Sequence, residues 1–254
     1  MQLTIEALRA SVFSSALLDY RQVPVDEWWR RVAGVNAEQV SRNAQSASAV
    51  AEGPFDKGRL AVVGLPGRVD WQLLPVAARA PEWPTVGEWP NYIPHFVEPV
   101  KAWLREFGVA NRVAFGAVVI AIVQTRDEAY HAVEAGLSDL KLKVGSSEVS
   151  DFLLQFNKPV PSRHGPQGMV LNRLARWSAA VLKPVTLQLS IGTNPPMIAP
   201  MPEASQTELH AARIELDFNT MPDWSGQLAS EQAAELFDEL VRVAIDYVGE
   251  RLRS

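Results

Sequence analysis

Residues 159–177 combine the residue types that most often recognise a partner. A loop rich in proline and glycine, residues 159–168, leads into a strand predicted over residues 168–181. Arginine and tryptophan dominate the energetic hot spots of protein interfaces, and exposed loops often carry function. We therefore expect the following residues to contact a protein or peptide partner: Arg163, His164, Arg173, Arg176 and Trp177.

Strand periodicity divides these side chains between two faces. Arg176 falls on one face of the predicted strand, whereas Arg173 and Trp177 fall on the other. Glu215 and Asp217, on another predicted strand, are candidate structural partners of the arginines. The alternative is that the arginines contact an anion or a peptide carboxylate, and the pattern leaves both interpretations open.

Catalysis has little support in the sequence. The chain has no cysteine, so it has no thiolate nucleophile, and its four histidines never stand at metal-ligand spacing. Phosphate-loop, dinucleotide-binding and nucleophile-elbow motifs are also missing, so no catalytic, cofactor-binding or metal-binding residue is assigned. An enzyme would need a nonstandard site around His164, Arg173 and Arg176, with His164 as the general base.

The overall charge and hydropathy disfavour further classes of function. A formal charge of −5 argues against broad binding to nucleic acid or to anionic membranes. The longest apolar run, Val113 to Val123, is shorter than the roughly 20 residues of a membrane-spanning helix. The first residues lack the basic and apolar pattern of a signal peptide, so we expect a cytoplasmic location.

The predicted elements follow one order twice. Strand-like alternation, short helices after Asp26 and Asp127, and an amphipathic stripe over residues 231–252 set this order. The four residues from Gly64 to Gly67 predict a hairpin turn, and dense prolines predict an extended strap over residues 75–99. In the first half we predict strands at 8–18, 46–52, 58–65 and 68–76 and a helix at 99–107 that Gly108 ends. In the second half we predict a strand at 112–125 covered on both faces, a helix at 127–135 capped by Asp127, strands at 151–157, 168–181, 185–191 and 210–219, a proline-rich loop at 193–202, and a helix at 231–252 capped by Ser230.

This order predicts an α+β fold with largely antiparallel sheets and amphipathic helices packed on one face. We expect residues 1–108 and 109–254 to be two halves of one packed domain. The repeated β-α-β-β-β-α order also predicts an internal duplication, with the strands at 8–18 and 112–125 equivalent. The helices at 99–107 and 231–252 would then be equivalent as well.

Three short motifs resemble a family of uncharacterised, sporadically distributed bacterial proteins of similar length. The first joins Gly58-Arg59-Leu60 to Pro66-Gly67-Arg68-Val69-Asp70-Trp71, the second is Leu171-Asn172-Arg173-Leu174, and the third is Ile214-Glu215-Leu216-Asp217-Phe218. The resemblance implies a bacterial accessory protein, and it implies no activity or catalytic residue.

The sequence therefore favours a non-catalytic intracellular binding or accessory protein that recognises a protein or peptide. Two alternatives remain open: a carrier or sensor with a small-molecule site between helix and sheet, and the nonstandard enzyme described above. A deep pocket with converging polar groups would favour either alternative.

Overall fold

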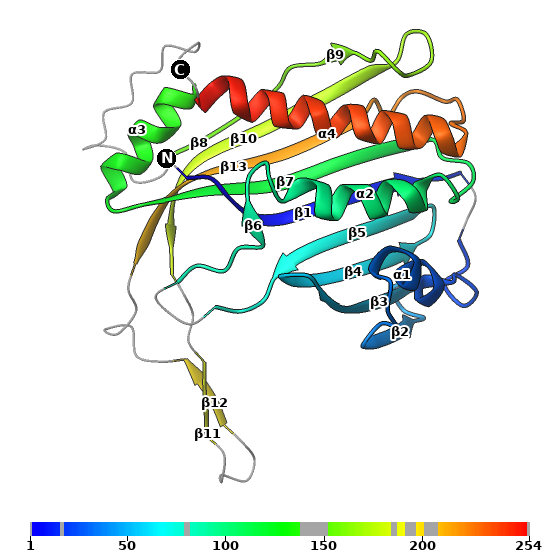
Figure 1. The fold of residues 1–254 in the computed structure, drawn as a ribbon, viewed down its shortest axis with the longest axis horizontal. Coiled ribbons are helices and arrows are strands. Elements are labelled where there is room, and N and C mark those ends of the chain that lie inside the picture. The colour runs from blue at the N-terminus through cyan, green and yellow to red at the C-terminus, as the bar shows by residue number, and fades with distance from the viewer. Residues whose placement is uncertain are drawn as a thin grey trace.

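One large antiparallel sheet organises the protein (Figure 1). The computed structural model describes residues 2–15, 18–78, 82–137, 152–183, 187–190, 197–200 and 208–252. Within these residues the main path of the sheet runs β2-β3-β4-β5-β1-β7-β13-β10-β8, with β6 paired to β1 and β9 paired to β10. The strands of this sheet are β1 (Thr4–Phe13), β2 (Gln39–Asn43), β3 (Ser48–Phe55), β4 (Gly58–Leu65), β5 (Arg68–Pro75), β6 (Gly87–Glu88), β7 (Arg112–Val123), β8 (Phe152–Asn157), β9 (Val160–Pro161), β10 (Val170–Leu182) and β13 (Leu209–Thr220). A separate hairpin consists of β11 (Leu187–Ser190) and β12 (Met197–Pro200).

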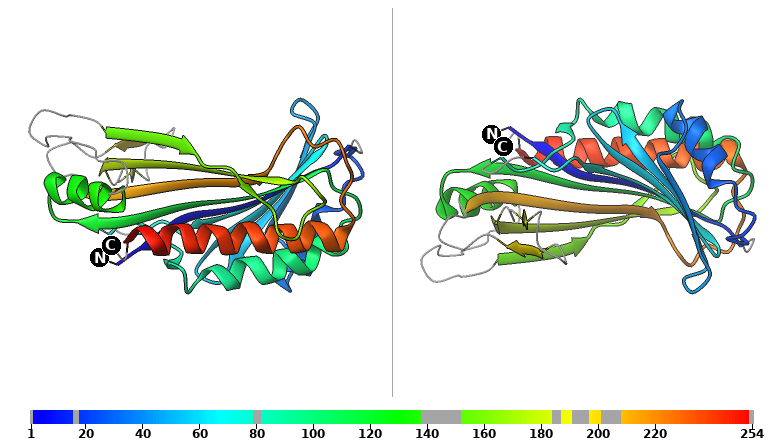
Figure 2. Two further views of the ribbon diagram at one scale, coloured as in Figure 1. Left: turned by 90° about the horizontal axis from the view of Figure 1, so that it is seen from above. Right: turned by 90° about the horizontal axis from the view of Figure 1, so that it is seen from below.

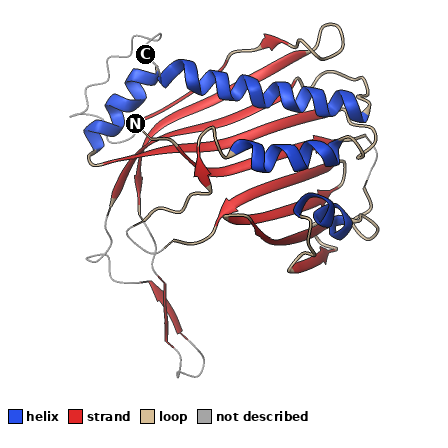
Figure 3. Ribbon diagram, in the orientation of Figure 1, coloured by secondary structure: helices blue, strands red, loops and turns tan. Residues whose placement is uncertain are grey.

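The described helices cover one face of the sheet. They are α1 (Val25–Ala33), α2 (Ile93–Leu104), α3 (Arg126–Gly136) and α4 (Ser230–Leu252). Figures 2 and 3 show α2 and α4 side by side along this face, and Lys101 of α2 contacts Asp238 of α4 at 3.0 Å. The α+β class, the antiparallel pairing and the placement of helices on one face are confirmed.

A single hydrophobic core fills the layer between the helices and the sheet. Trp71 on β5 packs edge-to-face on Trp103 of α2 at 5.3 Å, and Phe115 on β7 packs likewise on Phe237 of α4 at 6.1 Å. Phe237, Leu240 and Val241 are all buried, as the amphipathic stripe of this helix predicts. Because residues of both halves share one core cluster and β1 pairs with β7, the halves are packed together.

The two halves have the same strand order when the sheet is followed outward from its centre. The first half runs β1, β5, β4, β3 and the second runs β7, β13, β10, β8. In each half the central strand is followed by a helix, then by strands that return from the edge to the centre, and then by a closing helix. This correspondence fits the expected duplication, which itself stays a prediction.

The helix α2 begins earlier than the sequence predicted. The helix begins at Ile93 rather than at residue 99, so the predicted proline strap is shorter than expected. Pro94 lies in the first turn, where the missing N–H costs no intrahelical hydrogen bond, and Pro99 is accommodated inside the helix. Gly108 does have a positive φ of 102°, but it lies beyond the end of the helix.

Other boundaries also differ from the predictions. The first strand is Thr4–Phe13 rather than 8–18. The side chain of Thr125 caps α3 by accepting a hydrogen bond from the Glu128 N–H, where Asp127 was expected to be the cap. The fully exposed strand β2 was missed because it lacks an apolar face, and β12 lies within the predicted loop at 193–202. Residues 138–151, where one predicted strand begins, lie outside the described residues.

Candidate functional site

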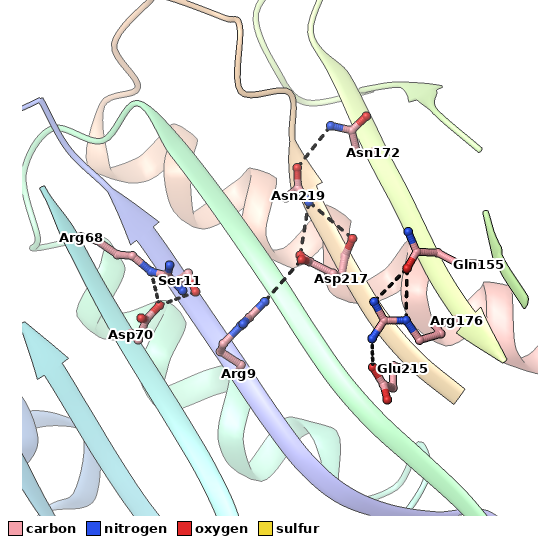
Figure 4. Close-up of polar contacts among 10 residues, drawn as sticks. All are labelled: Arg9, Ser11, Arg68, Asp70, Gln155, Asn172, Arg176, Glu215, Asp217 and Asn219. Atoms are coloured by element: carbon pink, nitrogen blue, oxygen red, sulfur yellow. Dashed lines mark hydrogen bonds and ion pairs between the residues drawn. The ribbon is translucent and has the colours of Figure 1, made fainter. Parts of the chain in front are cut away.

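The sheet face opposite the helices, called the open face below, carries a row of polar side chains (Figure 4). Strand alternation places them there, since their neighbours in sequence are buried under the helices. The row crosses β5, β1, β7, β13 and β10 and so joins both halves of the chain.

Gly116 allows an ion pair to cross the centre of the sheet. Arg9 on β1 and Asp217 on β13 are both in register with Gly116 on β7, which lies between them. A Cβ atom built at Gly116 would lie 3.4 Å from Nε of Arg9, so a larger side chain would displace the guanidinium. The glycine therefore lets Arg9 reach across β7, where its NH2 atom lies 3.5 Å from the Asp217 carboxylate.

A buried carboxylate anchors the β5 end of the row. Asp70 accepts hydrogen bonds from Ser11 Oγ at 2.5 Å and from Arg68 Nε at 2.8 Å. Asp70 is 4% exposed, so these donors replace the water that the carboxylate loses.

On the β10 side, the charges of two arginines and two glutamates offset one another. Arg176 NH1 lies 2.8 Å from Glu215, and Arg213 pairs with both Glu215 and Glu6. Gln155 on β8 accepts two further hydrogen bonds from Arg176. The structural interpretation of Arg176 is therefore confirmed for its partner Glu215.

A shallow hollow of about 370 Å³ lies at the centre of the open face. Its lining combines small residues on β1 and β7 with charged and apolar side chains on the flanking strands. The lining residues are Ala7, Leu8, Arg9, Gln72, Leu74, Gly116, Ala117, Val118, Leu174, Arg176, Glu215, Leu216 and Asp217. β7 was predicted to be covered on both faces, and residues 113–117 and 119–121 are indeed buried. On the open face Ile120 packs with Leu182 and Ala211, whereas the small residues around Gly116 form the floor of the hollow.

Phe13 lies between two arginines at one end of the open face. Arg68 and Arg112 are its direct cross-strand neighbours, and their guanidinium carbons lie 5.0 and 4.8 Å from the ring centroid. Burial lowers the pKa of Arg112, and the charges of Arg68 and Arg9 lower it further, whereas Asp217 opposes this shift. Nε of Arg112 is buried without a hydrogen-bond partner.

The predicted loop at 159–168 is held against α4. Glu239 is 4% exposed and accepts hydrogen bonds from Ser162 Oγ at 2.6 Å and from the backbone N–H groups of Arg163 and His164 at 2.7 and 3.2 Å. Nε2 of His164 lies 3.4 Å from Arg242 on the same helix. The side chains of Arg163 and His164 are exposed, and they lie away from the open face.

The five residues expected to bind a partner do not form one site. Trp177 is 1% exposed and donates a hydrogen bond to Tyr247 of α4 at 3.1 Å, so it belongs to the core. Arg173 donates to the Lys158 carbonyl at 2.7 Å. Arg176 is the one member of the set on the open face, as strand periodicity predicted.

Sequence reasoning missed most of the polar row. The row includes Arg9, Ser11, Arg68 and Arg112, which lie on β1, β5 and β7; the sequence predicted these strands but not a functional role for these polar residues. Alternation predicts which face of its own strand each polar residue lies on. Whether these residues come together depends on which strands pair, and a single stretch of sequence does not contain that information.

No family model, curated protein or solved structure matches the chain. Among the described residues, no group of three or more histidine, aspartate or glutamate side chains is arranged to hold a metal ion. None of the helices described is both long and apolar enough to cross a membrane.

Proposed function

We propose that this is a non-catalytic binding protein and that a protein or peptide partner occupies the open face. The observation that carries the proposal is the one-sided packing of the helices, which leaves a broad sheet surface with a central hollow. Large surfaces of mixed apolar and polar character are typical of interaction sites.

The chemistry of the open face favours protein over nucleic acid as the partner. Its arginines are largely offset by carboxylates, as in the Arg9–Asp217, Arg68–Asp70 and Arg176–Glu215 pairs, so the face lacks the dense positive charge that phosphate backbones require. Exposed apolar side chains accompany these pairs: Leu74 is 49% exposed and Leu153 is 63% exposed. An apolar centre with paired charges suits a polypeptide surface.

The two alternatives have weaker support in the geometry. The layer between helices and sheet, where a carried small molecule was expected, is filled by fully buried aromatic side chains such as Trp29, Trp71 and Trp103. For the enzyme alternative, Arg176 lies on the open face while His164 lies against α4. The carrier alternative therefore requires a small ligand in the hollow of the open face instead.

The test compares matched variants of exposed residues by cross-linking in cells that produce the protein. Leu74→Asp places a charge beside the hollow, and Val35→Asp is the control, since Val35 is also exposed, at 55%, but follows α1 on the other side of the molecule. Arg176→Glu and Arg163→Glu similarly separate the open face from the loop on α4.

We expect Leu74→Asp and Arg176→Glu to abolish the specific cross-links, and Val35→Asp, Arg163→Glu and His164→Ala to retain them. Loss of cross-links in Arg163→Glu alone would move the interface to the loop and refute the proposal. A cellular phenotype that requires His164 while the cross-links persist would favour the enzyme.

A further inference from the structure

The strongest unexplained feature of the molecule is the pair of arginines that flanks Phe13, with a third arginine further along β1. Arg68 and Arg112 flank the ring on neighbouring strands, and Arg9 lies on the same strand and face as Phe13, four residues away. At about 3.3 Å per residue, Arg9 and Phe13 are separated by about 13 Å along β1. Long arginine side chains can span much of that distance. Burial lowers the pKa of Arg112, and the positive charges of Arg68 and Arg9 lower it further.

The carboxylates near this cluster are already engaged. Asp70 accepts hydrogen bonds from Ser11 and Arg68, and Asp217 contacts Arg9 and accepts a hydrogen bond from Asn219 at 3.2 Å. Three guanidinium groups therefore share two carboxylates, which leaves one positive charge in excess.

Arg112 carries that excess charge. No described residue makes an ion pair or a hydrogen bond with its guanidinium group, which lies against the face of Phe13. Arg9 also has a buried Nε without a hydrogen-bond partner. A half-buried cation without a counter-ion is costly, because burial removes water that nothing in the protein replaces.

We propose that Arg112, with Arg68 and Arg9, forms a subsite for an oxyanion, either a carboxylate or a phosphate group. A guanidinium group presents its N–H donors in a planar fork that matches both groups. The aromatic face of Phe13 holds the two flanking arginines in place before the anion arrives.

This inference rests on the proposed function, because the partner on the open face would supply the anion. Arg112 and Gly116 are four residues apart on β7, so the Arg112 end of the subsite lies about 13 Å from Gly116, whereas Arg9 also lines the hollow. An extended partner segment with an acidic residue and an apolar residue four positions apart spans the same distance. A free small anion is the other source of the same chemistry.

The first arm of the test uses inorganic phosphate with the purified full chain. Phosphate should raise the melting temperature above that in chloride of equal ionic strength, because a ligand of the folded state stabilises it. Arg112→Met should weaken phosphate binding about tenfold or more, measured by calorimetry, because charge-assisted hydrogen bonds are lost. Arg59→Met is the matched control, since Arg59 is on the open face but already pairs with Glu38 at 2.9 Å.

A merely structural arginine would behave differently in the absence of phosphate. The subsite predicts that Arg112→Met melts in chloride at the same temperature as the wild type or higher, because the substitution removes an uncompensated cation. Arg112→Lys should fold equally well and bind phosphate more weakly than the wild type, since lysine lacks the fork. A lower melting temperature of Arg112→Met in chloride, or unchanged phosphate binding in that variant, would overturn the proposal. So would a wild-type protein that does not distinguish phosphate from chloride.

The second arm distinguishes the sources of the anion with a synthetic extended peptide that has glutamate and leucine four residues apart. Displacement of phosphate by this peptide, and not by its glutamine counterpart, supports a partner carboxylate. Phosphate binding that is lost in Arg112→Met but resists the peptide supports a free anion. Phosphate binding that persists while Leu74→Asp leaves the cellular cross-links intact would refute the proposed partner surface and keep the subsite.

Discussion

Replacing Glu239 should release the loop at residues 159–168 from α4, although Glu239 is far from this loop in sequence. Its carboxylate accepts hydrogen bonds from one hydroxyl and two backbone N–H groups of residues 162–164. In Glu239→Ala, these donors lose their acceptor at a buried site, since Glu239 is only 4% exposed. The loop would then have to open to let water replace the lost acceptor.

The size of this effect follows from the contacts. A hydrogen bond to a charged group contributes about 1.5–3 kcal/mol to the free energy of unfolding. The three bonds share one carboxylate, and water can reach part of the opened loop, so they are not additive. We expect Glu239→Ala to lower the free energy of unfolding by about 3–5 kcal/mol, less than the sum of three such bonds, because three donors lose one shared acceptor.

The assay combines urea unfolding with limited trypsin digestion. Glu235→Ala is the matched control, because Glu235 is an exposed glutamate one turn earlier on α4 and the change in helix propensity is the same. Glu239→Ala should shift the urea midpoint and accelerate cleavage after the exposed Arg163, whereas Glu235→Ala should do neither. Equal midpoints and equal cleavage rates for the two variants would show that Glu239 does not hold the loop.

Two further predictions concern packing and pH. Gly136→Ala should destabilise the protein by about 1–3 kcal/mol, because its Cβ would lie 2.4 Å from the buried ring of Trp177, whereas Gly249→Ala in α4 meets nothing within 4 Å and should stabilise by up to about 1 kcal/mol. Thermal unfolding of both variants tests this, and the same sign for both would refute it. Burial, aided by the Asp56 carboxylate, raises the pKa of Tyr92 to about 12. The folded state therefore favours the neutral phenol. The resulting contribution to the free energy of unfolding is fully present below about pH 10, and at most about 2–3 kcal/mol of it is lost as the pH rises to about 12. Tyr92→Phe should remove this part of the alkaline loss of stability in urea titrations, and an unchanged pH slope would contradict the assignment.

The sequence by itself determined the elements whose signals are local. The alternation from His210 to Asn219 predicted β13, and the apolar stripe containing Phe237 predicted the face of α4 that packs on the sheet. The turn from Gly64 to Gly67 predicted the β4–β5 hairpin, and Gly67 has the expected positive φ of 71°. These signals depend on backbone geometry and side-chain periodicity within a few residues, which is why they can be read in one stretch.

Boundaries were less well determined where two local rules compete. Proline generally disfavours helices, so Pro94 and Pro99 pointed to an extended strap. The buried apolar face of α2, which includes Phe96 and Trp103, outweighs that preference. Tertiary packing supplied this stabilisation, and it is not visible from the prolines alone.

Only the tertiary structure decided where the candidate site lies. Arg9, Gly116 and Asp217 are distant in the chain, and the pairing of β1 with β7 and of β7 with β13 makes them neighbours. The same packing buried Trp177 under α3 and α4, although its residue type suggested an interface. The physical reason is that periodicity assigns a side chain to one of two faces of a strand, whereas strand order and helix placement decide which face remains exposed and which charges meet there.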